Sequence, residues 1–406
     1  MRSKRIRVLI TGAAAMAIGI CAETTVSDRS LSAHDPVSIA VEKGMKWLAS
    51  VQGKDGGWGR DGGETSYVRQ GERLESNGND VANTAVAAEA LLHTGNTPIS
   101  GPYHESLQRG VRFILEHVER SPTDGLAVTD LTGTQIQRKL GPYIDTFLTS
   151  KLLAELDGNM GDAQANARVR RSLEKCVAKV EKNQLKDGSW NVAGGWAPIL
   201  GTSMASQSLF VAKEKGVPVA QMAMDRVETY SKVTAASPPP AGVGGGVGSG
   251  VAGGSLAGVG PTVMASSRVM TAEVSAVSAG ISLYKRAQEL EQLSRTPEDR
   301  KKNATEIRAI ETQLADPRFI TGFGSIGGEE FFSYLNISDS LRRAGGPEWD
   351  RWNSDMKAKI LKMQNEDGTW AGHHCITGRV AVTSAAILML VADREKNFLT
   401  TSAPKR

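Results

Sequence analysis

One seven-residue pattern, Gln-x-x-Asp-Gly-x-Trp, occurs three times in this chain, as Gln52-Gly53-Lys54-Asp55-Gly56-Gly57-Trp58, Gln184-Leu185-Lys186-Asp187-Gly188-Ser189-Trp190 and Gln364-Asn365-Glu366-Asp367-Gly368-Thr369-Trp370. Each copy ends an amphipathic stretch, and the glycine after aspartate can adopt the positive φ that stops a helix. We expect the Gln amide to bond carbonyls at the helix end and the indole to fold back over that amide and the turn. The pattern therefore predicts a helical repeat protein in which the motif clamps helices together.

Apolar residues at helical spacing predict six successive pairs of helices separated by turns. In each pair the first helix is the more charged and the second is richer in small residues. This asymmetry predicts an outer ring that faces water and an inner ring packed closely around an axis, although an open solenoid fits the same periodicity. The expected pairs are 37–52 with 80–94, 104–119 with 142–157, 166–184 with 198–215, 218–233 with 267–284, 285–315 with 328–344, and 348–364 with 377–393.

The first 22 residues have the pattern of a secretory signal peptide. Residues 1–7 are basic, residues 8–21 form an apolar run, and residues 20–22 resemble a cleavage site. The run is too short for a comfortable membrane span, and no later segment approaches 18 unbroken apolar residues. We therefore expect a protein exported to the periplasm, cell envelope or exterior, with no transmembrane span after cleavage. A lipoprotein anchored through Cys21 is the alternative.

The rest of the chain is expected to form one domain, residues 37–396, between a flexible segment at 23–36 and a tail at 397–406. Residues 235–268 are rich in Pro and Gly and are expected to form an exposed insertion. The alternating charges of 285–315 are typical of a solvated helix face.

The basic excess of the chain belongs to the expected leader. The whole sequence has 48 Lys and Arg against 44 Asp and Glu, and four of the basic residues lie in residues 1–22. The charge balance therefore gives no reason to expect a nucleic-acid partner. Two cysteines, Cys176 and Cys375, remain after cleavage and could pair in an oxidising compartment.

The repeated pattern, preceded in its first copy by Lys43-Gly44-Met45-Lys46-Trp47-Leu48, resembles the QW motif of the prenyltransferase/squalene oxidase repeat superfamily, which contains terpenoid cyclases and protein prenyltransferases. The resemblance covers residues 37–393 and implies an all-α fold, an (α/α)6 toroid of six helical hairpins. Within the superfamily, the chain is most similar to exported bacterial repeat proteins that lack an assigned activity.

The chain lacks the residues on which the superfamily's chemistry depends. Bacterial cyclases protonate their substrate with an Asp-x-Asp-Asp cluster and line the cavity with aromatic rings, but this chain has no such cluster and only 8 Phe, 7 Trp and 6 Tyr. Prenyltransferases hold Zn²⁺ through an Asp-x-Cys pair and a His, but the pair is missing and Val382 lies near the position of the His. The motifs therefore do not support catalysis.

In a closed toroid, the N-termini of the inner helices and their positive dipole ends meet at one mouth. The catalytic candidates there are Asp80, Asp145, Glu329, Glu330 and Arg379; the metal-ligand candidates, which could hold Zn²⁺, are His373, His374 and Cys375. Capping of helix N-termini is the structural alternative for the acids. We expect the three clamps to lie remote from this mouth, and His34, His93, His104 and His117 to be surface or helix-packing histidines.

Three functions fit these observations. The first is an exported binding protein that holds a small hydrophobic ligand, a lipid or a peptide in the toroid cavity. The second is a diverged terpenoid cyclase or prenyltransferase-type enzyme, with or without a metal. The third is a structural interaction module of the cell envelope.

Overall fold

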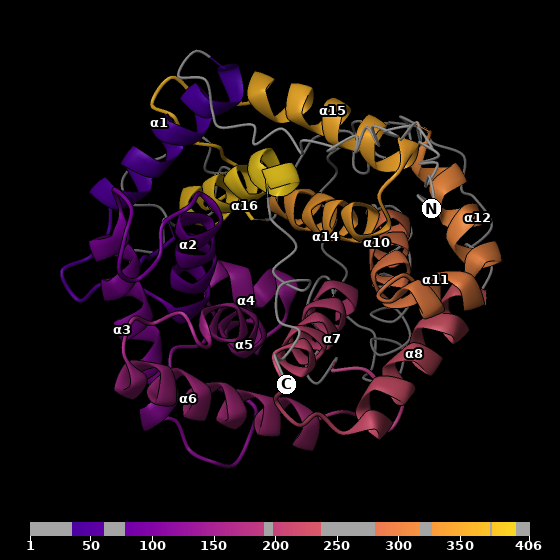
Figure 1. The fold of residues 1–406 in the computed structure, drawn as a ribbon, viewed down its shortest axis with the longest axis horizontal. Coiled ribbons are helices and arrows are strands. Elements are labelled where there is room, and N and C mark those ends of the chain that lie inside the picture. The colour runs from indigo at the N-terminus through magenta and orange to yellow at the C-terminus, as the bar shows by residue number, and fades with distance from the viewer. Residues whose placement is uncertain are drawn as a thin grey trace, which may run out of the picture.

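The computed structural model describes residues 35–60, 78–190, 198–236, 281–316, 327–373 and 376–394. Within these ranges the regular structure is helical, and the extended pairing consists of two isolated β-bridges. The helices form two concentric rings (Figure 1). The all-α toroid predicted from the sequence is confirmed.

The outer ring contains the more charged helix of each pair. Its members are α1 (Pro36–Ser50), α3 (His104–Arg120), α6 (Ala163–Lys182), α8 (Gln221–Ala236), α11 (Pro297–Lys302) with α12 (Ala304–Leu314), and α15 (Pro347–Lys362). The inner ring contains α2 (Val81–His93), α5 (Ile144–Leu156), α7 (Pro198–Glu214), α10 (Ile281–Leu293), α14 (Gly328–Ala344) and α16 (Arg379–Val391). A short α4 (Gln135–Leu140) precedes α5, and η1 (Ala392–Arg394) follows α16.

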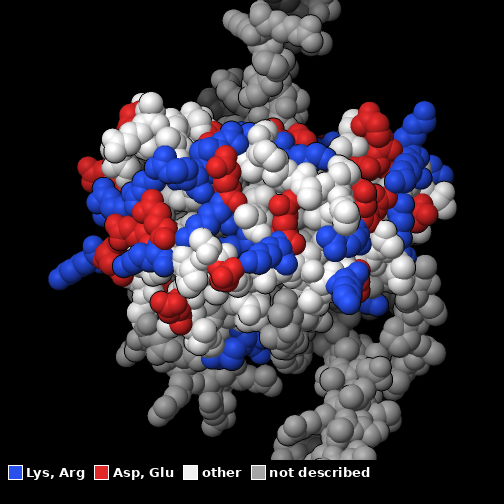
Figure 2. Space-filling view, turned by 90° about the horizontal axis from the view of Figure 1, so that it is seen from below, with Lys and Arg blue, Asp and Glu red and all other residues white. Residues whose placement is uncertain are grey.

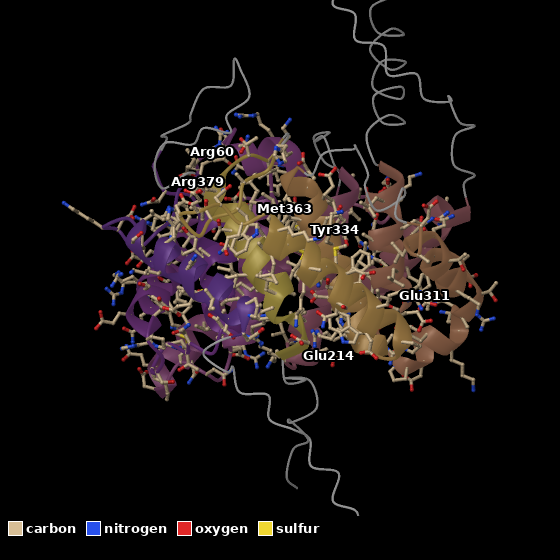
Figure 3. The ribbon with its side chains drawn as sticks, turned by 90° about the horizontal axis from the view of Figure 1, so that it is seen from above. Arg60, Glu214, Glu311, Tyr334, Met363 and Arg379 are labelled. Carbon is tan, nitrogen blue, oxygen red and sulfur yellow. The ribbon has the colours of Figure 1, made fainter. Side chains whose placement is uncertain are left out.

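The inner ring is closed. Each inner helix contacts the next in the order α2, α5, α7, α10, α14, α16, and α16 contacts α2 again. Arg379, the first residue of α16, and Glu214, the last residue of α7, lie at opposite ends of the molecule (Figure 3), as parallel inner helices require. An open solenoid is therefore excluded, and the six inner helices surround a common axis.

One predicted helix pair has a different boundary. The segment 285–315 was expected to be a solvated outer helix, but its first part belongs to inner helix α10, and only α11 and α12 lie in the outer ring. The prediction was wrong because ion pairs at i, i+4 spacing occur on exposed and buried helix faces alike. Glu291 and Arg295 form such a pair, with Arg295 Nε and Nη2 donating to the carboxylate at 2.9 and 2.8 Å, and both side chains are buried.

The three clamps join the outer helices to one another. Each tryptophan donates its indole N–H to a carbonyl in the last turn of its own outer helix, as Trp58 does to Leu48 at 2.8 Å. Each glutamine bonds the carbonyl of the motif's own glycine and a carbonyl of the following outer helix; Gln52, for example, donates to Ser106. The two side chains therefore differ from their predicted roles. The indole, and not the Gln amide, bonds the carbonyl at the end of its own helix, and the amide reaches the following outer helix.

The clamps also lie close to the inner helices, so the expectation that they are remote from the mouth was wrong. The Trp58 carbonyl accepts from the backbone N–H of Asp80 at 3.0 Å, and Trp58 N donates to Thr84 Oγ1 at 2.8 Å. The motif glycine is indispensable to this turn: Gly188 has a φ of +93°, and an added Cβ would lie 2.3 Å from the Arg226 carbonyl oxygen. Each clamp therefore fixes the start of an inner helix as well as the end of an outer one.

Several sequence predictions lie outside the described residues. They concern the signal peptide at 1–22, the 23–34 segment, nearly all of the 235–268 insertion and the 397–406 tail. In the part of the chain that is described, no helix has both the length and the apolar character needed to cross a membrane. Cys176 is a buried free thiol whose pKa is raised to about 12 by burial. Basic and acidic side chains are interspersed over the face shown in Figure 2, without an extended field of one sign.

Candidate functional site

Two of the predicted acids, Asp80 and Asp145, lie together where α2 and α5 begin. Asp80 caps α2, and its two carboxylate oxygens accept from the backbone and side-chain nitrogens of Asn83, both at 2.8 Å. Asp145 reaches across from α5, accepting from Ala82 N at 3.0 Å and from Gln137 Nε2 at 2.7 Å. The acid pair thus joins two neighbouring inner helices at their N-terminal ends.

Both carboxyls are almost inaccessible to water, and this changes their acidity. Burial raises the pKa of Asp80 to about 6, against the opposing effect of its bonds to Asn83. Burial, and then the charge of Asp80, raise the pKa of Asp145 to about 7. The pair can therefore hold a proton near neutral pH. If Asp80 is taken as the first residue of an Asp-x-Asp-Asp cluster, the other two acidic positions are occupied by Ala82 and Asn83. The acid pair is therefore not the Asp-x-Asp-Asp cluster with which bacterial cyclases protonate their substrate.

The remaining predicted catalytic residues have structural partners. Glu330 closes a capping box by accepting from Gly327 N at 3.0 Å, and Glu329 accepts from Ile376 N at 3.1 Å. Arg379 donates to Asp367 Oδ2 at 2.6 Å. Arg379 is therefore directed to the third clamp and not to the acid pair, while the two glutamates fix the start of α14 and the loop before α16.

Of the three predicted metal ligands, the structure describes one. His373 is an exposed residue in the loop between α15 and α16. His374 and Cys375 lie outside the described residues, so their placement beside His373 stays a prediction.

A second group of ionisable side chains lies near the C-terminal ends of α2 and α5, and the sequence did not predict it as a site. His93 Nε2 is 2.8 Å from Glu155 Oε2, and Lys151 Nζ is hydrogen-bonded to Glu89 Oε1 and lies 3.9 Å from Glu155 Oε1. We call these four residues the ionic cluster. Its members span two helices, so His93 does join packed helices, but it does so as part of an ionisable cluster that the sequence did not reveal.

The charges of the ionic cluster act on one another strongly. Burial raises the pKa of Glu89; Lys151 opposes this effect, and Glu155 adds to it. Burial alone would lower the pKa of Lys151, but the carboxylates of Glu89, Glu155 and Asp339 outweigh it and raise the pKa. Asp339 belongs to α14, so the negative charges that act on Lys151 come from its own side of the axis, through Glu89 and Glu155, and from α14.

Polar side chains also bridge the axis between helices that are not neighbours in the ring. Gln207 of α7 donates to Asp339 Oδ2 of α14 at 3.0 Å, and Asn336 of α14 donates to Ser203 Oγ of α7 at 3.3 Å. All four side chains are buried. The axis is therefore crossed by hydrogen bonds, which a long hydrocarbon chain could not replace.

Near the end of α14, two guanidinium groups lie against the ring of Phe210. The guanidinium carbons of Arg295 and Arg343 lie 5.3 and 5.5 Å from the ring centroid of Phe210. Burial lowers the pKa of Arg343, although Glu291 and Asp339 oppose this effect. Arg343 Nη1 is buried and has no hydrogen-bond partner among the described residues.

Helix α10 carries further buried amide atoms without a partner in the described chain. They are Nε2 of Gln288 and both Nε2 and Oε1 of Gln292, whose residues are 2% and 4% exposed. Leaving a buried polar atom unbonded costs about 1–3 kcal/mol. These atoms and Arg343 Nη1 thus give the α10 and α14 side of the inner ring several buried polar atoms that the described residues leave without a bond.

A separate groove lies on the outer surface between α12 and α15, above α14. Its volume is about 270 Å³. Trp352, Met356 and Leu341 provide apolar lining, and Glu311, which is labelled in Figure 3, also lines the groove. Burial and the charge of Glu348 raise the pKa of Glu311. This concave surface belongs to the outer ring and is distinct from the polar axis.

With the fold and these groups described, the class of protein is an α/α toroid of paired helices. A family model described as the squalene-hopene cyclase C-terminal domain matches residues 23–139. A squalene–hopene cyclase from Bradyrhizobium diazoefficiens is 35% identical over 82 residues, which cover 20% of this chain and 11% of the cyclase. Through these two matches the chain is similar to members of the terpenoid cyclase/prenyltransferase superfamily over its N-terminal part, and the toroidal fold agrees with that similarity.

Proposed function

We propose that this toroid binds a small polar molecule that carries a negative charge, at the α10 and α14 side of its inner ring, and that it does not cyclise a hydrocarbon. The observation that carries the proposal is the buried Arg343 Nη1, which has no hydrogen-bond partner among the described residues. A ligand carboxylate or phosphate oxygen would supply that partner, because guanidinium groups bind such oxygens in planar geometry.

The local charges favour an anionic ligand. Arg295 is neutralised by Glu291 in a two-bond pair, and Arg342 lies 4.0 Å from Asp339. Arg343 adds a third guanidinium to these two acids, so a ligand with one negative charge would balance the group. The contact of the Arg343 guanidinium with the face of Phe210 helps to hold the group in place without using its N–H donors.

The test uses the mature chain with acetate, succinate and inorganic phosphate as probes, followed by calorimetric titration and thermal denaturation. We expect at least one anion to bind with saturation, and Arg343→Met to weaken its binding by tenfold or more. The matched control is Arg308→Met, on an exposed position of α12. Binding of no anion, or equal binding by Arg343→Met, would refute the proposal and assign the unpartnered atoms to solvent.

A diverged cyclase is the second candidate, and the acid pair favours it, because a carboxyl with a pKa near 7 can donate a proton at neutral pH. The hydrogen bonds that cross the axis oppose it. Incubation with squalene and analysis of the extract by mass spectrometry would decide: cyclised product formed by the wild type and lost in Asp145→Asn would favour the enzyme. If the chain is instead an interaction module of the cell envelope, the groove between α12 and α15 is the surface it would use. Each of these three proposals includes export of the chain.

A further inference from the structure

We infer that Glu89, His93 and Glu155 form a binding site for one divalent transition-metal ion, of which Zn²⁺ is the representative, at the C-terminal end of α2 and α5. The three residues offer one imidazole nitrogen and two carboxylate oxygens, and these ligand atoms all lie within 4.8 Å of one another. These three ligands are shared neither with the proposed anion site nor with the sequence-predicted ligands at 373–375.

The helical frame explains why these three side chains converge. Glu89 and His93 are four residues apart on α2, so they lie one turn apart on the same face. Glu155 stands on α5, the neighbouring inner helix. Two ligands from one rigid helix and one from the next give a site whose geometry does not depend on a loop.

The distances suit an ion after small side-chain movements. Zn²⁺ binds imidazole nitrogen and carboxylate oxygen at about 2.0–2.2 Å in tetrahedral sites, which requires about 3.4 Å between ligand atoms. His93 Nε2 and Glu155 Oε2 are 2.8 Å apart, and the largest separation in the set is below 4.8 Å. Rotations of about 1 Å at the ends of these side chains therefore suffice, and the backbone can remain in place.

The charge count around the site favours a divalent ion. Lys151 is surrounded by three carboxylates, because Asp339 on α14 acts on it together with Glu89 and Glu155. Asp339 already lies 4.0 Å from Arg342, so Lys151 is left with Glu89 and Glu155, and one ammonium cannot neutralise two carboxylates. An ion bound by Glu89 and Glu155 would supply the missing positive charge, and the long flexible side chain of Lys151 can move away from it.

The site can also be reached and can keep an open coordination position. The side chains of His93, Lys151 and Glu155 are 8%, 12% and 18% exposed, whereas that of Glu89 is 3% exposed. Three protein ligands with partial access to water are the usual composition of a zinc site that binds a fourth ligand from solution.

The experiment titrates the chelator-treated mature chain with Zn²⁺ and Co²⁺ in competition with a chromophoric chelator. We expect one ion per chain, and affinity lowered at least about tenfold by His93→Gln and by Glu89→Gln. His117→Gln, on outer helix α3, is the matched control and should bind as the wild type does. Lys151→Met should bind more tightly, since the competing ammonium is removed.

A second measurement needs no variant. X-ray absorption at the zinc edge of the loaded wild type should show one imidazole and only oxygen or nitrogen neighbours. A sulfur neighbour would assign the ion to Cys375 and overturn the inference. The inference also fails if the wild type binds no ion below millimolar concentration, or if His93→Gln binds unchanged, in which case the four residues form an ion-pair network alone.

Discussion

Replacing Asp145 by asparagine should remove a measurable part of the pH dependence of folding. Its carboxyl is fully buried and has its pKa raised to about 7 from an ordinary value of 3.8, first by burial and then by the charge of Asp80. At pH values between the ordinary pKa of 3.8 and the raised pKa of about 7, Asp145 keeps its proton in the folded chain but has lost it in the unfolded chain. Stability conferred through this group is therefore lost as the pH rises toward 7 and stays constant above it.

The magnitude follows from the same numbers. One pH unit corresponds to 1.36 kcal/mol for one proton, so the complete effect of Asp145 is about 4 kcal/mol. Between pH 5 and pH 7 the wild type should lose about 2 kcal/mol of unfolding free energy through this group, rising to about 3 kcal/mol by pH 8, and the asparagine variant should not. The variant exchanges one acceptor oxygen for an amide donor, facing Ala82 N and Gln137 Nε2, but that cost does not depend on pH.

The assay is urea unfolding followed by circular dichroism at pH 5, 6, 7 and 8 and constant ionic strength. The quantity to compare is the variant's free energy of unfolding minus that of the wild type, since buried groups that do not interact with Asp145 titrate equally in both proteins and cancel in the difference. We expect it to rise by about 3 kcal/mol across this range. Asp130→Asn, at an exposed position, is the control. A difference that stays constant within about 0.5 kcal/mol would refute the assigned burial cost of Asp145.

The clamps give three further predictions. Gly188→Ala should lower the unfolding free energy by more than the roughly 1 kcal/mol expected of Gly158→Ala, because both glycines have positive φ but only Gly188 faces a backbone carbonyl, 2.3 Å from the new Cβ; thermal melts of the two variants provide the comparison. Trp58→Phe should cost about 1–3 kcal/mol in urea unfolding, since it leaves the Leu48 carbonyl with only the 3.3 Å bond from Val51 N and leaves part of the space of the larger buried ring unfilled. Gln364→Leu removes the bond from the last clamp to a carbonyl of α1, so hydrogen exchange of α1 should accelerate while that of α6 stays unchanged.

The sequence predicted most of the fold because its helix ends are marked locally. The third inner helix was expected to begin at Pro198, and α7 begins there; the range 328–344 coincides with α14. The exception was the segment 285–315: its charge pattern predicted a solvent-exposed outer helix, but its first part belongs to the inner helix α10. The pair Glu291 and Arg295 has the spacing of a surface ion pair, and only the closed ring shows that α10 is surrounded by protein. Whether a charged helix faces water is decided by its neighbours and not by its own sequence.

The candidate sites were predictable only in part, for a related reason. Asp80 and Asp145 could be named because acids at helix starts are conspicuous, and the structure brings them together. Glu89 and Lys151 were missed because each lies between apolar residues away from a helix start, where a charge has no conspicuous capping role. Their signal was available: in an inner helix with nearly every residue buried, a charged side chain must find a partner, and the closed ring brings it from a neighbouring helix.

The energetics of the axis favour a functional explanation of its charges. Buried ion pairs seldom add stability compared with well-packed apolar residues of similar size, because their removal from water costs several kcal/mol for each ion. The toroid does not need them for closure, since the clamps and the bonds at the helix N-termini already join the hairpins. Apolar residues in place of Lys151, Glu155 and Arg343 would therefore keep the ring and avoid that cost. Charges retained at such a cost, with polar atoms on α10 and α14 that the described chain leaves unbonded, are what a site for a polar ligand requires.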